Sequence, residues 1–412
     1  MLTMTINQQN VIQKSIFWIV IFAVSYNGLL AVLNANVLAV NFKMVAGFEF
    51  LILLSAMLLI VKTQLTQLDT KEIVFVVFVA VVALLISIIN QYLFIDGLRN
   101  FLIIALFMML GRRISKETLH QVFFVISVVV LAFLIIEVFA LELYVQIFSP
   151  AQYYASTRGA EIAEFNDTGL FNNANAQQMS GRFGYGIFNG PRTSSIFLEQ
   201  VSISNFTIIL TIYLAVFWEV ISTKKRLMFV ALVLMVLITA RSRSALALTL
   251  FALFTYRFLS LITVRASLFI LPAILLIIFM VYLFFPLAYG VVMEDSFKGR
   301  IYHSGYLLVN FNLADYFSMN IHKLARYADS GIPYVITSYT LLGAIGLWLY
   351  TATAVRAECP QNRRFILLAN LYFWSLLMVG AAVFTIKTAP LIWLLAGFLS
   401  ATYDNKLLGE SK

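Results

Sequence analysis

Two arginines one residue apart, Arg241 and Arg243, stand where a long apolar run meets polar sequence. Two guanidinium groups at this spacing repel each other unless an anion lies between them, and their planar donors match phosphate oxygens in pairs. At the start of a helix they would add to the positive end of its dipole. The pattern predicts a phosphate or diphosphate site at a membrane surface. A lipid headgroup fits the same chemistry, so both ligands remain open.

The segment PRTSSIFLEQVSISNF, residues 191–206, predicts a helix that carries both charges into an apolar run. Pro191 suits the first position of a helix, where no N–H is needed. Because residues three and four apart share a face of a helix, one polar face would hold Arg192, Ser195, Glu199 and Ser202. Charges inside a membrane favour a functional interpretation. The simpler alternative is an arginine that snorkels at the helix end beside a neutralising glutamate.

A second polar segment, residues 288–333, carries further candidates for chemistry. Arg300 and Arg326 could bind a diphosphate, and His303 and Asp329 are candidate general bases, as is Glu199. Imidazole titrates near neutral pH, which suits proton transfer. If the segment is helical, Arg300 and His303 point the same way. The alternative for a lone histidine outside the membrane is a solvated or structural role.

Motifs for cofactors are absent from the sequence. It contains no HExxH, CxxC or DxD pattern and no glycine-rich nucleotide loop. Its one cysteine, Cys359, excludes an internal disulfide and a cysteine-rich metal site. The net charge of +9 does not indicate nucleic-acid binding, because most basic residues lie between apolar runs. We therefore expect no cofactor, no metal and no nucleic-acid partner.

The elements that position these residues must be membrane helices. The chain has 412 residues, of which 62% are hydrophobic and 11% charged, a composition typical of an all-α polytopic membrane protein. At roughly twenty apolar residues per crossing, we predict about twelve spans, near 15–33, 44–61, 72–90, 94–111, 119–143, 200–221, 227–240, 244–262, 267–288, 334–354, 365–384 and 388–403.

Basic residues fall on alternate turns between these spans, which predicts that both termini are cytoplasmic. Two long polar loops then lie on the outer side, at residues 149–191 and 288–333, within a single transmembrane domain, 1–412. The first loop carries Arg158 and Arg182 in addition to the residues above. Lipid excludes exposed loops from its hydrocarbon region, so both loops must lie outside it.

Acidic residues gather toward the outer half of the predicted spans, namely Glu49, Glu137, Glu142 and Glu199. A charge at the middle of a bilayer costs about 2.5–3.5 kcal/mol on insertion scales. Several such charges at one depth predict a water-filled cavity that opens outward. The alternative is that each side chain snorkels separately to the surface.

Four segments together resemble one family. PRTSSIFLEQVSISNF resembles the Arg-x-Ser-x-Phe-x-Glu helix of bacterial surface-polysaccharide polymerases, and TARSRSALALTL resembles the Ser-Arg-x-x-x-Leu signature of O-antigen polymerases and ligases. GRIYHSGYLL resembles part of the second outer loop of these proteins, and the segment YADSGIPYVITSYTLLGAIGLWLY resembles the glycine-containing helix that follows that loop. TIKTAPLIWLLAGFLSA resembles the last helix of exopolysaccharide polymerases. Residues 185–403 thus resemble the repeat-unit polymerases of the O-antigen polymerase and ligase superfamily, whereas the first five helices match only in hydropathy.

This resemblance implies a function. The family members are glycosyltransferases that join undecaprenyl-diphosphate-linked oligosaccharide repeat units into a surface polysaccharide at the periplasmic face of the bacterial inner membrane. The implied partners are a lipid-linked glycan donor and acceptor, the membrane lipids, and a chain-length regulator and flippase of the same pathway. A donor that carries its own sugar–diphosphate bond needs no nucleotide.

The resemblance also implies residue roles. Arg192, Arg243 and Arg300 match the arginines assigned to the lipid diphosphate, and Glu199 matches their acidic partner. Two departures accompany the match. Asp329 and Ser330 stand where ligases often carry His-Asn, and Arg158 with Gly169 fits only one of the two Arg-x10-Gly loops of some polymerases.

Two other functions remain open. An O-antigen-type ligase would move the glycan to a different acceptor. A transporter of lipid-linked or anionic substrates belongs to another class, and transporters tend to show paired broken helices in matching halves and charges at the midplane. The sequence shows no internal repeat of this kind.

Overall fold

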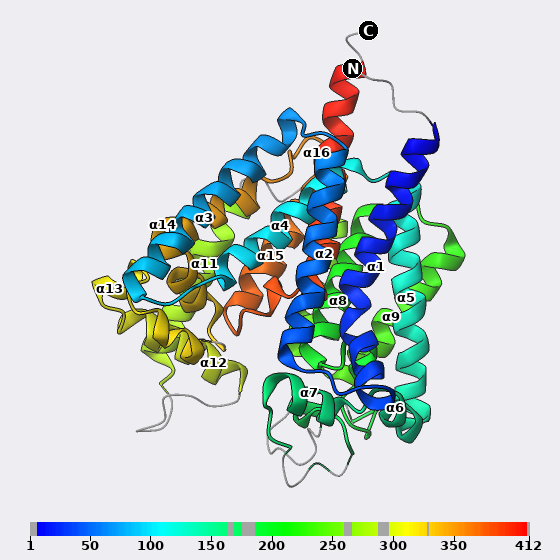
Figure 1. The fold of residues 1–412 in the computed structure, drawn as a ribbon, viewed down its shortest axis with the longest axis horizontal. Helices are drawn as coiled ribbons and strands as arrows, with labels where there is room; N and C mark the ends of the chain where they lie inside the picture. Colours follow the sequence, from blue (N-terminus) through cyan, green and yellow to red (C-terminus); the bar gives the residue numbers. More distant parts are fainter. Residues whose placement is uncertain are drawn as a thin grey trace. The chain divides into compact units, whose positions relative to one another are not determined.

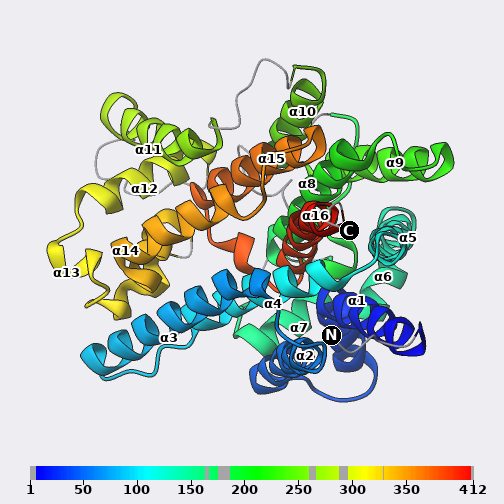
Figure 2. The same ribbon diagram turned by 90° about the horizontal axis from the view of Figure 1, so that it is seen from above.

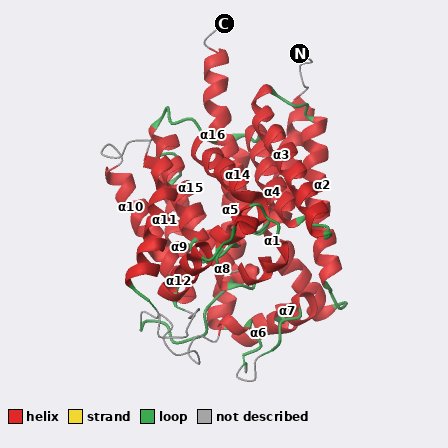
Figure 3. Ribbon diagram, turned by 90° about the vertical axis from the view of Figure 1, so that its left-hand side faces the viewer, coloured by secondary structure: helices red, strands yellow, loops and turns green. Residues whose placement is uncertain are grey.

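The computed structural model describes residues 6–162, 166, 168–174, 186–258, 266–286, 296–327 and 329–409, without the side chains of residues 6, 173, 325, 326 and 402–409. Within these ranges all regular structure is helical (Figure 3). The α-helices are α1 (Ile6–Asn36), α2 (Phe42–Lys62), α3 (Thr70–Asn90), α4 (Asp96–Arg113), α5 (Lys116–Phe139), α6 (Leu141–Phe148), α7 (Pro150–Arg158), α8 (Gln200–Phe217), α9 (Thr223–Ala240), α10 (Arg243–Phe258), α11 (Ala266–Phe284), α12 (Phe297–Val309), α13 (Leu313–Tyr316), α14 (Gly331–Thr353), α15 (Pro360–Leu377) and α16 (Ala389–Gly409). Short 3-10 turns are η1 (Gln67–Asp69), η2 (Asn172–Ala174), η3 (Ser195–Phe197), η5 (Ile321–Tyr327) and η6 (Ala382–Phe384).

Seven of the described helices are long and apolar enough to cross a membrane: α1, α2, α3 with η1, α5, α8, α11 and α14. Their sequences explain the helices, because long apolar runs begin at residues that cap them. Asn41 accepts a hydrogen bond from the Met44 N–H at the start of α2, and Ser115 accepts one from Thr118 before α5. The prediction of an all-α membrane protein is supported, and the number of about twelve spans stays a prediction.

The chain forms two compact units. The first comprises Met1–Leu65, Leu106–Leu250 and Ile386–Phe398, and the second comprises Thr66–Ala105, Phe251–Thr385 and Leu399–Lys412. Helices α4, α10 and α16 each contribute to both units. The residues predicted to do chemistry are therefore divided, with Glu199 and the arginines near residue 192 and residue 241 in the first unit and the residues near 300 and 329 in the second.

In the first unit the central helix is α8, whose membrane-length window is 94% buried. It packs against α9, while α1 packs against α2, α5, α6 and α7 (Figures 1 and 2). The α4 and α16 backbones meet so closely at Gly111 and Gly397 that a Cβ on either residue would collide with the other helix. Small residues at such crossings let membrane helices approach each other.

In the second unit α14 packs against α3, α11, α12 and α15, and α12 lies along α11 (Figure 2). Helix α14 is interrupted at Thr340, whose φ of 64° is not helical. The second polar loop of the sequence contains α12, α13 and η5, so the condition under which Arg300 and His303 share a helix is met.

Candidate functional site

The segment before α8 departs from the prediction. The helix does not begin at Pro191: residues 191–194 are irregular, η3 follows, and α8 starts only at Gln200 with Glu199 as its N-cap residue. Ser195 (φ 49°) and Leu198 (φ 60°) adopt left-handed backbone conformations. The predicted polar face that joins Arg192 to Glu199 is therefore wrong, because these residues are not on one continuous helix.

A buried carboxylate explains why this segment is unwound. Glu137 of α5 is 3% exposed and accepts hydrogen bonds from the Ser194 N–H (2.9 Å) and the Ser195 N–H (2.7 Å). The Tyr144 hydroxyl donates to the Ser195 carbonyl (2.6 Å), and the Ser195 hydroxyl donates to the Val130 carbonyl (2.7 Å). Side chains thus satisfy backbone groups that a helix would otherwise pair internally, which is how non-helical backbone is tolerated inside a membrane protein.

Of the other acidic residues of the predicted cavity, Glu49 interacts electrostatically with Lys387, which lies between η6 and α16. Glu49 accepts a hydrogen bond from the Tyr26 hydroxyl (2.5 Å), and Glu142 is exposed at the start of α6. Glu199 forms close ion pairs with two cations of the described chain.

Glu199 holds two cations at the start of α8. Its Oε1 lies 3.3 Å from Arg158 Nη1, and its Oε2 lies 3.2 Å from Lys387 Nζ. The Ser202 hydroxyl also donates to Oε2 (3.2 Å). Arg158 is the last residue of α7, and Lys387 lies between η6 and α16. Three segments that are distant in sequence therefore meet at one carboxylate, and we call Arg158, Glu199 and Lys387 the charge cluster.

Tyr154 contacts both cations of the charge cluster. Its hydroxyl accepts a hydrogen bond from Lys387 Nζ (3.2 Å), and the Arg158 guanidinium lies 4.6 Å from the centre of its ring. Asn27 of α1 donates to the Phe197 carbonyl (3.2 Å) and accepts a hydrogen bond from the Tyr153 hydroxyl (2.8 Å). These contacts tie α1, α7 and the unwound segment together and fix the positions of the charges.

The exposure of the three side chains in the charge cluster increases from Lys387 to Arg158. The Lys387 side chain is 3% exposed, that of Glu199 20%, and that of Arg158 47%. Burial alone would raise the pKa of the Glu199 carboxyl, but the charges of Lys387 and Arg158 outweigh it and lower that pKa to about 2. Burial lowers the pKa of Lys387, against the opposing effect of Glu199.

These charges define what the cluster can do. Two cations meet one carboxylate here, and the exposed cation, Arg158, can contact an anion that approaches from its side. Both Glu199 oxygens already accept contacts, and a carboxylate with so low a pKa is a weak base. The geometry therefore favours Glu199 as the residue that positions Arg158 and Lys387, and not as the general base that the sequence predicted.

The arginines of the other predicted site in this unit contact a neighbouring loop. Arg192 Nε donates to the Ala240 carbonyl (2.8 Å), and Arg241 donates to the carbonyls of Phe188 and Gly190. Arg243 begins α10, as predicted, whereas Arg241 does not share this helix start, because it is the left-handed C-cap of α9 (φ 52°). Arg243 is exposed, whereas Arg241 is 9% exposed and holds the loop that precedes α8.

In the second unit Arg300 and His303 both lie on α12. Arg300 Nη1 lies 3.3 Å from Asp329 Oδ1, with the two side chains 31% and 48% exposed. The predicted base Asp329 is thus an ion-pair partner of a predicted diphosphate ligand. His303 packs its ring parallel to that of Tyr306, and the side chain of Arg326 lies outside the described part of the chain.

Sequence reasoning missed Lys387. Its signal was present: it is the only charged residue between residues 365 and 403, a stretch that is otherwise apolar or neutral. Such an isolated charge beside apolar sequence indicates a buried partner. Among the described residues, no group of three or more His, Cys, Asp and Glu side chains could hold a metal ion.

Comparison of the chain with protein-family models, with curated proteins and with solved structures found no match.

Proposed function

We propose that this chain is a membrane glycosyltransferase that joins undecaprenyl-diphosphate-linked repeat units into a surface polysaccharide. The observation that carries the proposal is the charge cluster, which places two cations, Arg158 and Lys387, at the start of α8, where PRTSSIFLEQ resembles the polymerase motif. In this proposal the protein lies in the bacterial inner membrane with both termini in the cytoplasm, and the reaction takes place at the periplasmic face.

The proposed reaction exchanges one bond for another. An acceptor sugar hydroxyl attacks the anomeric carbon of the donor, a C–O bond forms, the sugar–diphosphate bond breaks, and a base takes the hydroxyl proton. Fixed cations help most where negative charge develops, here on the leaving diphosphate. We assign that role to Arg158 and Lys387, with Glu199 as their positioning residue. Arg192, Arg243, Arg300 and Arg326 remain further candidates for the diphosphate, and His303 and Asp329 for the base.

The test uses the exposed member of the cluster, because its loss disturbs folding least. Purified protein in lipid, given undecaprenyl-diphosphate-linked repeats from the source cell and no nucleotide, should produce a ladder of longer lipid-linked glycans. We expect Arg158→Ala to slow chain growth on the order of 10²-fold, the effect of removing one preorganised charge. Arg257→Ala, which removes an exposed arginine at the end of α10, is the matched control.

Normal chain growth by Arg158→Ala would remove the charge cluster from the mechanism. Absence of any ladder from folded wild-type protein would contradict polymerisation itself. Transfer of the glycan only to an added second acceptor would identify the ligase alternative instead.

A transporter is the second candidate, and one observation favours it. Helical regularity is broken in each unit, before α8 in the first and at Thr340 of α14 in the second. Transporters use such interruptions to expose backbone to a substrate. Vesicles that contain the protein would then move a lipid-linked glycan across the membrane without forming a glycosidic bond.

A further inference from the structure

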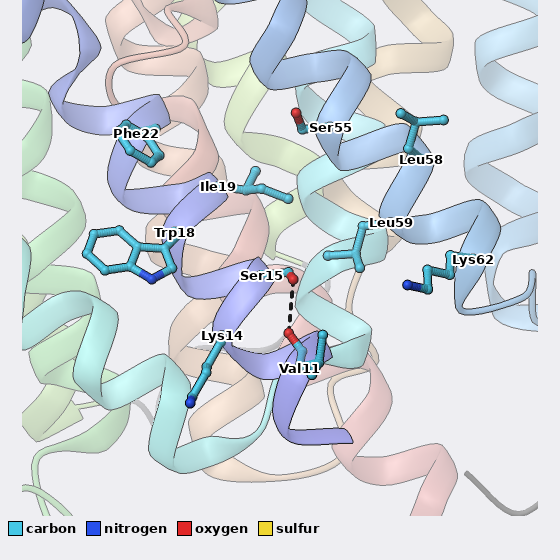
Figure 4. A pocket seen from close by; sticks show the side chains of 10 residues that line it. All are labelled: Val11, Lys14, Ser15, Trp18, Ile19, Phe22, Ser55, Leu58, Leu59 and Lys62. Carbon is cyan, nitrogen blue, oxygen red and sulfur yellow. Dashed lines mark hydrogen bonds between the residues drawn. The ribbon is translucent and has the colours of Figure 1, made fainter. Parts of the chain in front are cut away.

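A groove lies between α1 and α2 in the first unit, and none of the charge-cluster residues lines it. It has a volume of about 710 Å³ and is an open groove, not an enclosed cavity. Figure 4 shows the side chains that line it, among them Lys14, Trp18 and Phe22 of α1 and Ser55, Leu58 and Lys62 of α2. On each helix they recur at spacings of three and four residues, so they form one face of α1 and one of α2.

The length of the groove is apolar. Trp18 is 54% exposed, Phe22 49% and Leu58 58%, so large hydrophobic surfaces face outward. The two serines add little polarity, because the Ser15 hydroxyl donates to Val11 of its own helix (2.9 Å; Figure 4) and the Ser55 hydroxyl donates to Leu51 (2.7 Å). Such a surface suits a hydrocarbon chain.

One end of the groove is cationic. Lys14 lies 22 residues before the end of α1 and Lys62 lies 20 residues after the start of α2, so at 1.5 Å per residue both lie about 30 Å from the turn that joins the helices. In Figure 4 both lysines lie toward the Val11 end, away from Phe22. Among the described residues neither ammonium group forms an ion pair with a carboxylate.

The two walls are held in place at this end by Arg113. Its Nε donates to Thr63 Oγ1 (2.8 Å), just beyond α2. Its own carbonyl accepts a hydrogen bond from Gln13 of α1 (2.8 Å), and Gln13 also accepts one from the Ser115 N–H (2.7 Å). The groove is therefore preformed at the level of its lysines, which reduces the cost of ordering a ligand.

We propose that this groove binds one anionic glycerophospholipid. An acyl chain lies along Trp18, Phe22 and Leu58, and the phosphate lies at the level of Lys14 and Lys62. An apolar groove with cations at one end is complementary to a lipid that carries a negative headgroup, and basic pockets between membrane helices bind such headgroups. The site is distinct from the charge cluster and does not depend on the proposed reaction.

The experiment measures lipid retention by native mass spectrometry. Purified protein is titrated with phosphatidylglycerol or with phosphatidylcholine of the same acyl chains. Each lysine near an anionic lipid should contribute about five-fold in affinity, so Lys62→Gln should bind phosphatidylglycerol about five-fold more weakly and Lys14→Gln/Lys62→Gln about 25-fold. Lys43→Gln is the matched control, since it removes an exposed lysine from the opposite end of α2.

A second variant tests the apolar part of the groove independently of its lysines. Ser55→Phe, at an exposed position, should fill the apolar part and weaken phosphatidylglycerol binding without changing the net charge. Equal loss in Lys62→Gln and Lys43→Gln would show a general charge effect and overturn the proposal. So would equal retention of the two lipids by the wild type, or binding of glycerol 3-phosphate with the affinity of the whole lipid.

Discussion

Two ion pairs of nearly equal length have different surroundings in this molecule. Lys387 lies 3.2 Å from Glu199, and Arg300 lies 3.3 Å from Asp329. In the first pair the side chains are 3% and 20% exposed, and in the second they are 31% and 48% exposed. From distance alone, the two ion pairs would be expected to contribute similarly to stability. Burial separates them, because water screens the second pair and cannot replace a partner lost from the first.

The largest expected effect comes from removing the buried carboxylate. Glu199→Gln leaves Lys387 charged and buried without its partner, and we expect the protein to lose about 3–5 kcal/mol of unfolding free energy. Thermal unfolding of the purified protein in detergent provides the measurement. The double variant Glu199→Gln/Lys387→Met should be more stable than Glu199→Gln, because it removes the unpaired charge. A double variant less stable than the single one would contradict this account.

A smaller effect is expected at the carboxylate that holds the unwound segment. In Glu137→Gln one oxygen becomes an NH₂ group that faces the Ser194 or Ser195 N–H donors, so at least one hydrogen bond is lost. We expect destabilisation of about 1.5–3 kcal/mol, the range for hydrogen bonds to charged groups. Glu142→Gln, at an exposed position of α6, should change stability by less than about 0.5 kcal/mol. Equal unfolding temperatures for the two variants would show that Glu137 does not hold this segment.

The contrast also shows which features the sequence could predict. Long apolar runs determine membrane helices directly, because a helix satisfies its own backbone in lipid. The break before α8 could not be predicted, since it depends on Glu137, which lies 57 residues from Ser194 along the chain. The charge cluster was predicted in part: Glu199 was identified as a charged site residue, but its partners come from α7 and from the segment before α16.

The predicted site in the second unit shows one relation that the sequence could predict and one that it could not. Arg300 and His303 lie on one helix, and their three-residue spacing then places them on the same face, because that relation is local. The pairing of Arg300 with Asp329 joins residues 29 positions apart, and spacing alone carried no signal for it. Local periodicity therefore predicted the elements, whereas the partners of each charge required the fold.

Acid should reveal the depressed pKa of Glu199. Because this pKa falls from 4.5 to about 2 on folding, the carboxylate contributes stability that is complete above about pH 4.5 and is lost as the pH falls toward 2. The difference in unfolding temperature between wild type and Glu199→Gln should stay constant from about pH 8 to about pH 5 and narrow below that. Narrowing already near pH 6 would indicate that the pKa of Glu199 is not depressed.

The smallest effect is expected at the exposed pair, where stability and activity can be separated. Asp329→Asn keeps the size of the side chain and removes the charge opposite Arg300. We expect a change in unfolding free energy of about 0–1 kcal/mol, which should disappear in about 1 M salt because exposed ion pairs are screened.

The same variant tests the base assignment in the glycan-ladder assay. If Asp329 takes the acceptor proton, Asp329→Asn should slow chain growth by about 10²–10⁴-fold while remaining folded. If chain growth is unchanged, the base must be sought elsewhere, first at His303 with the variant His303→Ala. A loss of several kcal/mol in Asp329→Asn would show that burial does not separate the two pairs.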